Sequence, residues 1–336
     1  MPKTKPPGLV AIEREMARQG KDAIVSFSDA AKRAGAVAAS IRRTGRLLLL
    51  GMGASHGLNR AAEPLFRAHG VDSVALPLSE QLDQPLSLDG RTVIVTSQSG
   101  ESAEVVRWLD LAHPGAEAFG MTMDAGSTLA RSLPSMIGAG GVETAFAATR
   151  STLVGAALHA AVLSALGTDP APFLQVLRAP ADPDIADAVA ALAGVRSIVT
   201  SARRLQGLAE VLALGLTELS RLPCFALECG QLRHGPMEML GPEVGAVFLR
   251  GADATGDLVR GLAEAVAAAG APTVVLDASG RAPATGAVTV DAGRHDGIAA
   301  LAALLPLAQR LMIAVAAPRV TDVGTPVRSQ KITRTE

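Results

Sequence analysis

The 336-residue sequence contains no tyrosine, a single tryptophan and only seven phenylalanines. Proteins that bind single-stranded nucleic acid stack the bases on aromatic side chains, and this sequence has few of them. Lysine and arginine together number 31 against 32 aspartates and glutamates, which gives a net charge of −1. Because the charges also form no basic block, we expect no binding driven by the phosphate backbone of a nucleic acid.

Cysteine and membrane-spanning segments are also scarce. The two cysteines, Cys224 and Cys229, are too few for a disulfide framework or a zinc ligand set. We therefore expect a reducing compartment, no metal and no cofactor. The N-terminus has no apolar segment of the kind that directs secretion. The apolar stretch 297–317 is interrupted by Pro306 and Arg310, which predicts a buried helix and not a membrane span. We expect a soluble, cytoplasmic protein with no membrane partner.

Two domains are expected from the length, and 49 % hydrophobic residues suffice to build their cores. Short apolar runs alternate with helical patterns in 44–166 and again in 185–320, which predicts an α/β fold with a parallel sheet in each half. A helical segment, 1–43, precedes them. The interval 167–184 carries four prolines and is predicted to be a linker. A polar tail, 321–336, follows. The repeated strand-helix plan indicates an internal duplication.

Two long helices are predicted outside the strand regions. Residues 9–43 are rich in alanine and have apolar spacing with few helix breakers. A second helix is predicted from about Thr144 to Leu166, after the last apolar run of the first half.

Small hydroxyl side chains follow two predicted strands of the first half. One group is Gly51 to Ser55, "GMGAS", and the other is Thr96 to Ser102, "TSQSGES". Ligands bind at the carboxyl ends of strands in doubly wound sheets, and a following helix offers free N–H groups to an anion. The pattern therefore indicates a phosphate site without lysine or metal. The alternative is that these serines only cap helices. The sequence has neither a P-loop nor a dinucleotide fingerprint.

Here the motifs resemble a known family. "GMGAS" followed by "SQSGES", then "ECGQLRHGP" and the ending "RSQKITRTE", resemble the sugar isomerase (SIS) domain. The chain is similar to the isomerase domain of glucosamine-6-phosphate synthase, to amino-sugar-phosphate deaminases and to sugar-amine deglycases. The resemblance implies two tandem SIS domains, each with a flavodoxin-like parallel five-stranded sheet flanked by helices.

The resemblance also implies where a sugar phosphate binds. The five residues that it places around the phosphate are Ser55, Ser97, Gln98, Ser99 and Ser102. The segment "ETAFAATRS", 143–151, matches the loop that closes the site in the family. Arg150 stands where the family usually has a lysine, and Ala148 stands where a serine contact to phosphate occurs. The turn "TSARR" in the second half has lost the motif, so we expect one phosphate site per chain.

Three residues are the catalytic candidates. Glu218 lies in the last turn of a predicted helix, where the helix dipole disfavours an anion, and it is sixteen residues before His234, the spacing of the family's pair. The resemblance implies that Glu218 moves the proton between C1 and C2, and that His234 opens the sugar ring. It implies that Lys331, near the end of the chain, forms a Schiff base with the ketose carbonyl. Without the resemblance, each would be read as a surface or structural residue.

Several positions depart from the synthase within the family. Gly215 and Thr217 stand where the resemblance expects lysines on the Glu218 helix, and Gln231 stands where it expects a glutamate. No glutaminase domain fits before residue 44, so the glutamine-dependent reaction is not expected.

Three enzyme activities and one binding function remain. The favoured one is an amino-sugar-phosphate deaminase and isomerase, in which the Schiff base of Lys331 with the ketose would assist the reaction. Plain aldose–ketose isomerisation and deglycation of a phosphorylated sugar-amine are the other enzymatic alternatives. A non-catalytic regulator that binds sugar phosphates is the alternative from another class, and the chain has no basic DNA-binding extension to support it. Because the histidine of relatives can reach into the neighbouring chain's site, we expect a homodimer.

Overall fold

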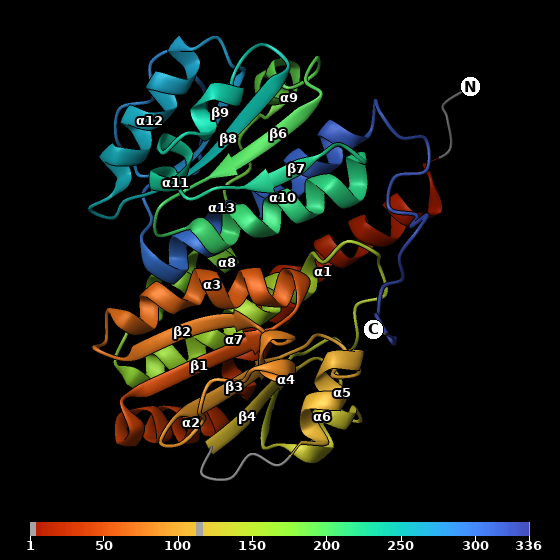
Figure 1. The fold of residues 1–336 in the computed structure, drawn as a ribbon, viewed down its shortest axis with the longest axis vertical. Coiled ribbons are helices and arrows are strands. Elements are labelled where there is room, and N and C mark those ends of the chain that lie inside the picture. The colour runs from red at the N-terminus through yellow and green to blue at the C-terminus, as the bar shows by residue number, and fades with distance from the viewer. Residues whose placement is uncertain (1–4, 112–116, 336) are drawn as a thin grey trace. The chain divides into compact units, whose positions relative to one another are not determined.

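The computed structural model describes residues 5–111 and 117–335, and it divides into two compact units. The first, here called the N-unit, comprises Ala11–Arg178 together with the tail from Pro326 onward. The second, called the C-unit, comprises 179–325 together with the described residues before Ala11. Each unit contains one parallel five-stranded sheet with helices on it (Figure 1).

The sheet of the N-unit has the strand order β2-β1-β3-β4-β5. Its strands are β1 (Arg46–Gly51), β2 (Asp72–Pro77), β3 (Thr92–Thr96), β4 (Glu117–Thr122) and β5 (Ser135–Ile137). All neighbouring pairs are parallel. The chain moves from β1 outward to β2 and then returns to the other side of β1, so the direction of winding reverses between β1 and β3. This reversal is the switch point at which α/β sheets bind ligands.

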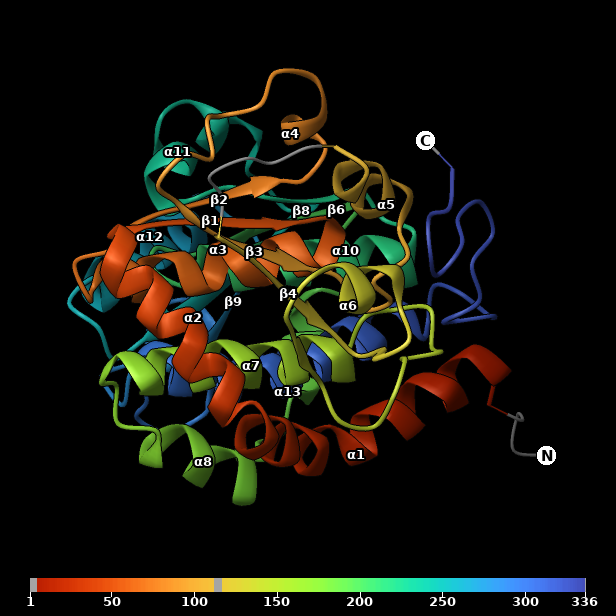
Figure 2. The same cartoon turned by 90° about the horizontal axis from the view of Figure 1, so that it is seen from below.

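The N-unit helices cover both faces of this sheet. They are α1 (Pro7–Asp29, in this unit from Ala11), α2 (Ala31–Thr44), α3 (Gly53–Arg67), α4 (Glu80–Asp83), α5 (Ala103–Leu109), α6 (Thr128–Ser132), α7 (Arg150–Leu166) and α8 (Ala171–Arg178). Helix α7 packs between α2 and α3 on one face, and α5 packs against α6 on the other (Figure 2). The central strands β1 and β3, which are covered on both faces, bury nearly all of their side chains, and this explains their apolar runs.

The core under α5 and α6 shows how the alternation of a strand divides the side chains. Leu48 and Leu50 of β1 and Val93 of β3 point to this face and pack with Trp108 of α5 and Leu129 of α6, all fully buried. The intervening residues of each strand point to the opposite face. The single tryptophan of the chain therefore lies in the core of the N-unit.

The C-unit repeats the plan. Its strands are β6 (Ser197–Ser201), β7 (Cys224–Ala226), β8 (Val244–Gly251), β9 (Thr273–Ala278) and β10 (Val288–Asp291). Their order, β10-β9-β8-β6-β7, is that of the first sheet with β6 in the place of β1 and β8 in the place of β3. The helical elements are α9 (Ala186–Ala191), α10 (Gln206–Ser220), α11 (Cys229–Arg233), the 3-10 turn η1 (Pro236–Met239), α12 (Gly256–Ala268) and α13 (Gly297–Ala316).

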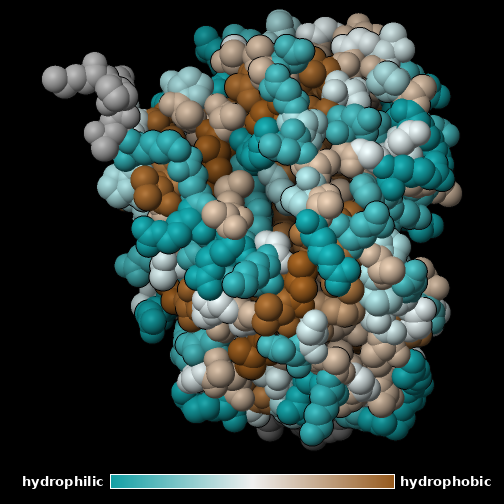
Figure 3. Space-filling model, turned by 180° about the vertical axis from the view of Figure 1, so that it is seen from behind, coloured by the Kyte–Doolittle hydropathy of each residue, from teal (hydrophilic) through white to brown (hydrophobic). Residues whose placement is uncertain are grey.

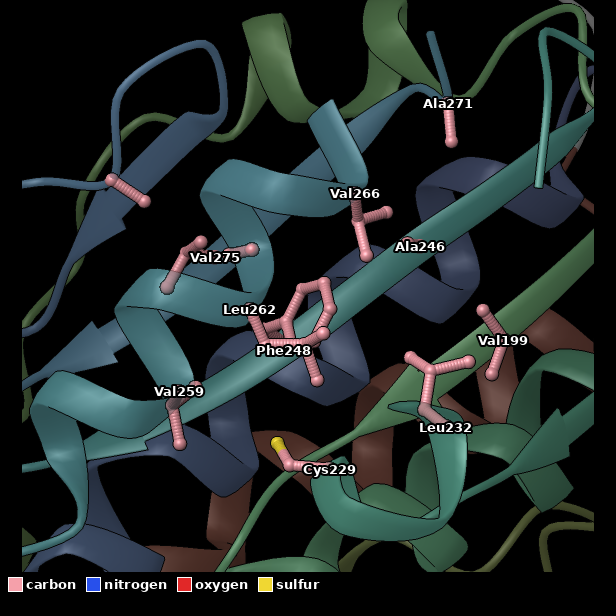
Figure 4. Packing of buried hydrophobic residues seen from close by; sticks show 12 residues of the cluster. Val199, Cys229, Leu232, Ala246, Phe248, Val259, Leu262, Val266, Ala271 and Val275 are labelled. Atoms are coloured by element: carbon pink, nitrogen blue, oxygen red, sulfur yellow. The ribbon is translucent and has the colours of Figure 1, made fainter. Parts of the chain in front are cut away.

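One core cluster of the C-unit joins the sheet to α11 and α12 (Figure 4). Phe248 of β8 is fully buried beside Leu262 of α12, and Leu232 and Cys229 of α11 belong to the same cluster. On the opposite face α10 packs against α13.

Helix α13 is long and apolar enough to cross a membrane, and it is the one such helix among the residues that the structure describes. However, 78 % of its most apolar window is buried, and it packs against α10 and β9 of its own unit. It is therefore built into the core, as the sequence predicts for this stretch. On the face shown in Figure 3, apolar side chains are interspersed with polar ones.

Residues 9–43 are helical, as predicted, and form the two helices α1 and α2. Two other local predictions need correction. The second long helix begins at Arg150 and not near Thr144. Its start is set by the side chain of Glu143, which accepts hydrogen bonds from the N–H groups of Thr149 and Arg150. The interval 167–184, predicted to be a linker, contains α8, whose prolines stand at its start, where a helix tolerates them.

Candidate functional site

The two hydroxyl-bearing loops lie side by side in the N-unit. Strands β1 and β3 are neighbours, and Gly51 at the end of β1 pairs with Thr96 at the end of β3. The loops that follow, 52–55 and 97–102, therefore leave the sheet together at the switch point. This is the arrangement that the sequence predicts for a phosphate site.

Glycine is required at two positions of these loops. A Cβ on Gly51 would lie 3.1 Å from the carbonyl oxygen of Thr96 and from the side-chain nitrogen of Asn59. Gly100 has a φ of +64°, and a Cβ there would lie 2.3 Å from the hydroxyl of Ser127. Any larger residue would push the loops away from the sheet end that positions them.

Ser97 and Ser99 are buried and shape the second loop. The Ser97 hydroxyl accepts a hydrogen bond from the N–H of Gly100 at 3.1 Å, and the Ser99 hydroxyl accepts one from the N–H of Glu101 at 3.2 Å. A hydroxyl that accepts in this way keeps its own hydrogen for another partner. The loop thus uses two of its backbone donors internally and leaves the serine O–H groups to donate to an anion.

The remaining candidate residues around these loops have different surroundings. Ser55 lies in the first turn of α3, whose N-cap position is Met52, and Ser102 is the N-cap of α5 but makes no capping hydrogen bond. Helix capping therefore does not account for either hydroxyl. The amide nitrogen of Gln98 donates to the backbone carbonyl of Glu143 at 3.3 Å, which joins the phosphate loop to the segment 143–151.

Lys331 lies in the same unit as these loops. Its ammonium donates to a carboxylate oxygen of Glu143 and to the carbonyl of Phe146, both at 3.3 Å. The N–H of Ala103, the first residue of α5, donates to the carbonyl of Thr333 at 2.9 Å. The C-terminal tail is therefore held at two points, one at each of the loops that the resemblance assigns to the site.

A buried polar network lies beneath both loops. The side-chain oxygen of Asn59 on α3 accepts from the hydroxyl of Thr96 at 2.9 Å and lies 3.1 Å from Nε2 of His159 on α7. Because an amide oxygen can only accept, Nε2 carries the hydrogen. Burial lowers the pKa of His159 from 6.5 to about 4. The network links the end of β3, α3 and α7, so His159 is a structural residue of the site.

The depressed pKa of His159 predicts an acid-sensitive N-unit. The imidazole titrates near 6.5 in the unfolded chain and near 4 in the folded one, so the unfolded state binds more protons in between. The free energy of unfolding should fall by about 3 kcal/mol between pH 7.5 and pH 4 through this group. Urea unfolding followed by Trp108 fluorescence measures it. The variant His159→Gln removes the titration, so its stability difference from wild type should shrink by that amount on acidification. A constant difference would contradict the assignment.

Glu218 and His234 belong to the C-unit. Glu218 is half-buried on α10, two residues before the helix ends at Ser220. His234 is exposed and follows α11 directly, with Gly235 at a φ of +113° turning the chain into η1. The predicted sharp turn at the "RHGP" motif is therefore present. The N-unit gathers the five phosphate candidates and Lys331, whereas these two candidates stand in the other unit.

No family model matches the sequence, and no curated protein matches it. Solved structures do. The C-terminal domain of glucosamine-fructose-6-phosphate aminotransferase from Francisella tularensis is 18 % identical, with a TM-score of 0.80 over 94 % of this chain and 98 % of that one. Tagatose-6-phosphate ketose/aldose isomerase from Escherichia coli is 18 % identical, with a TM-score of 0.77 over 97 % and 100 %. Glucosamine-6-phosphate deaminase from Thermotoga maritima is 18 % identical, with a TM-score of 0.73 over 97 % and 98 %.

The chain has the SIS fold. Its two parallel five-stranded sheets flanked by helices are those of an α/β SIS protein, so the resemblance read from the motifs is confirmed at the level of the fold.

Two departures from the SIS pattern have structural reasons. Arg150 is fully buried and donates to Glu15 and Asp22 of α1 and to the carbonyls of Ala139 and Gly141. It is a packing residue of the loop, which explains why a larger, five-donor cation replaces lysine.

The second departure is on the Glu218 helix. A Cβ on Gly215 would lie 2.4 Å from the sulfur of Met312 on α13. A lysine at this position would therefore have to displace the Met312 side chain. Thr217 is exposed, and its hydroxyl bonds to the carbonyls of Ala213 and Cys224.

The second SIS sheet has different chemistry at its switch point. The loop after β8 carries Asp253, which is 6 % exposed and accepts from the N–H of Thr255 at 2.7 Å. Arg204, in the loop after β6, lies 3.9 Å from the same carboxylate.

The sequence reasoning missed Glu143 and Thr333 as parts of the site. Glu143 lies in the segment that the motifs match to the closing loop, so the sequence pointed to this region. Nothing in the sequence pointed to the contact between Glu143 and Lys331. The Thr333 carbonyl acts through the backbone, which leaves no trace in residue types.

Proposed function

We propose that the chain is a phosphosugar-processing enzyme, and specifically a deaminase and isomerase of amino-sugar phosphates of the glucosamine 6-phosphate type. The observation that carries the proposal is the placement of the Ser97 and Ser99 hydroxyls at the switch point, with the amine of Lys331 held in the same unit. The names of the fold neighbours, which include glucosamine-6-phosphate deaminase, support the substrate class. The strand order supports the flavodoxin-like description of each domain.

The proposed reaction assigns one role to each group. The serine hydroxyls and Gln98 hold the phosphate, and His234 opens the sugar ring to the aldehyde. Glu218 takes the proton from C2 and returns it to C1, while the aldehyde oxygen gains a proton and the amine loses one, which leaves a hydroxymethyl group at C1 and an imine at C2. The amine of Lys331 adds to C2, the carbon that becomes the ketose carbonyl, and ammonia leaves, so an imine with Lys331 takes the place of the first one. Water then hydrolyses this imine, which releases the ketose phosphate and the free amine of Lys331. The proposal includes no metal or cofactor, and it places the enzyme in the cytoplasm as a homodimer.

The direct test is incubation with glucosamine 6-phosphate, followed by measurement of ammonia and fructose 6-phosphate. Equal amounts of both products are expected. Ketose formation from an aldose phosphate without an amine would indicate the plain isomerase instead. Release of a free amine other than ammonia from a phosphorylated conjugate would indicate the deglycase. A higher melting temperature without any product would indicate the regulator. No product and no thermal shift with any hexose phosphate would contradict the proposal entirely.

A double variant tests whether Ser97 and Ser99 bind the phosphate. Ser97→Ala combined with Ser99→Ala should weaken sugar-phosphate binding by about a hundredfold or more, because hydrogen bonds to a charged group are the strong ones. The measurement is the ligand-induced shift in melting temperature. The matched control is Ser28→Ala on α1, an exposed hydroxyl that bonds only its own helix, at the carbonyl of Ile24. An undiminished shift in the double variant would place the phosphate elsewhere.

A further inference from the structure

Glu143 is a fully buried carboxylate at the start of α7. Its oxygen Oε1 accepts three hydrogen bonds, from the N–H of Thr149 at 3.0 Å, from the Thr149 hydroxyl at 2.8 Å and from the N–H of Arg150 at 2.8 Å. Backbone N–H groups at a helix start have no partner within the helix, so a carboxylate there is well placed. These bonds fix the orientation of the whole carboxylate.

The second oxygen, Oε2, faces the tail. It accepts from the Ser151 hydroxyl and lies 3.3 Å from the ammonium of Lys331. The Lys331 side chain is 21 % exposed, whereas that of Glu143 is completely buried. This ammonium also donates to the carbonyl of Phe146, from the same loop. A lysine has a flexible stem, so two acceptors in one rigid loop decide where its amine lies.

The same loop contacts the phosphate loop. Gln98 donates to the backbone carbonyl of Glu143, and the tail continues from Lys331 to the bond between Thr333 and Ala103. Glu143 therefore stands where the closing loop, the phosphate loop and the tail meet within the N-unit.

We propose that Glu143 is the positioning residue for Lys331: its buried carboxylate holds the tail lysine at the phosphate loop and so places the amine for addition to the sugar carbonyl. The reactive part of this inference rests on the proposed function, whereas the positioning contact does not. Correct placement of a reacting group accounts for a large part of an intramolecular rate advantage, and a displacement of about 1 Å can cost about a hundredfold.

The variant Glu143→Gln keeps the hydrogen bonds of Oε1 and removes the attraction between Oε2 and Lys331. The amide oxygen can still accept from Thr149 and Arg150, so the start of α7 is kept. The amide nitrogen would face the Lys331 ammonium, and two donors cannot bond to each other. The matched control is Ser151→Ala, which removes the other partner of Oε2 and leaves the lysine contact in place. Trp108 fluorescence checks that each variant is folded.

The first measurement is the rate at which an amine-acylating reagent labels Lys331, read by mass spectrometry with the exposed Lys21 and Lys32 as internal references. The wild-type rate for Lys331 should be below that of the references, and Glu143→Gln should raise it by about fivefold to tenfold, as expected when a partly buried ion pair is lost. Ser151→Ala should not raise it. An unchanged rate in Glu143→Gln overturns the inference.

The second measurement is reduction with borohydride in the presence of glucosamine 6-phosphate or fructose 6-phosphate, which traps an imine on Lys331. Glu143→Gln should lower the trapped fraction at early times by about a hundredfold while the ligand-induced thermal shift is retained. Equal trapping in wild type and variant contradicts the inference. If labelling rises in the variant but the wild type traps no sugar phosphate, the positioning contact stands and the proposed reaction fails.

Should Glu143→Gln not fold, Lys331→Met tests the contact between Glu143 and Lys331 by changing the lysine instead. It leaves the carboxylate in its loop and removes the ammonium, so the tail should detach. Faster hydrogen exchange at the Ala103 amide, whose acceptor is in the tail, supports the inference. Unchanged exchange there overturns it.

Discussion

Glu218→Gln should lower turnover of the sugar phosphate by about a hundredfold to ten-thousandfold while the ligand-induced thermal shift remains. Glutamine has nearly the same shape as glutamate but cannot take a proton from carbon. The phosphate candidates lie in the N-unit and Glu218 lies in the C-unit, so the variant should not disturb the loops that we propose to hold the phosphate. Initial rates of ammonia release and melting temperatures with and without ligand are the two measurements.

The matched control is Glu210→Gln, the same substitution on the same helix. Glu210 lies two turns before Glu218, near the middle of α10, and its variant should keep normal turnover. If Glu218→Gln loses both turnover and the thermal shift, Glu218 has a structural role. If it keeps turnover, the assignment of the base is wrong.

The sheet and the place of the site could be read from the sequence for a physical reason. Strands buried on both faces need apolar side chains at every position, as in Leu47 to Leu50 and Val93 to Val95, and this pattern is local. The glycines and small hydroxyl residues at the strand ends also form patterns within short stretches of sequence. Residues that are close in the sequence were therefore enough to predict both the strands and the loops at the switch point.

The rest of the site depends on contacts between distant residues. Lys331 and Glu143 are 188 residues apart, and the tail has no periodic pattern that would show where it docks. The start of α7 was predicted too early because "AFAA" is apolar and alanine-rich. Its actual start depends on the side chain of Glu143 reaching forward to the N–H groups of Thr149 and Arg150. Propensity alone contains no information on such a bond.

Arg150 shows the same limit, since its partners are far away in the sequence. Glu15 and Asp22 on α1 are 135 and 128 residues from it. From the motif, Arg150 is only a departure from the lysine that the family usually has there. In the structure its guanidinium is completely buried and holds α1 to the loop that leads into α7. The departure thus concerns the support of the site and not the phosphate contact itself.

Arg150→Met should therefore lower the free energy of unfolding of the N-unit by about 3 to 5 kcal/mol, because it removes the buried cation that Glu15 and Asp22 share, and only the half-exposed Arg18 still pairs with Asp22. Methionine keeps much of the volume, so the loss is one of charge and hydrogen bonds and not of packing. Arg150→Lys should cost less, since it keeps the charge but has fewer and differently directed donors. Urea unfolding at neutral pH, followed by Trp108 fluorescence, gives both values.

The pH dependence of this loss identifies its cause. Burial raises the pKa of Glu15, but hydrogen bonds from Arg150 and from the N–H of Thr144 outweigh it, so its pKa lies below the usual 4.5. A carboxylate with a depressed pKa stabilises the fold above its unfolded pKa, and that contribution is lost as the pH falls through the folded pKa. In Arg150→Met the largest of the interactions that lower the pKa of Glu15 is removed, while those of Thr144 and Arg18 remain, so the stability difference from wild type should be largest at pH 7 and should shrink on acidification below about pH 4.5. A difference that stays constant with pH would mean that Arg150 stabilises the unit by packing alone.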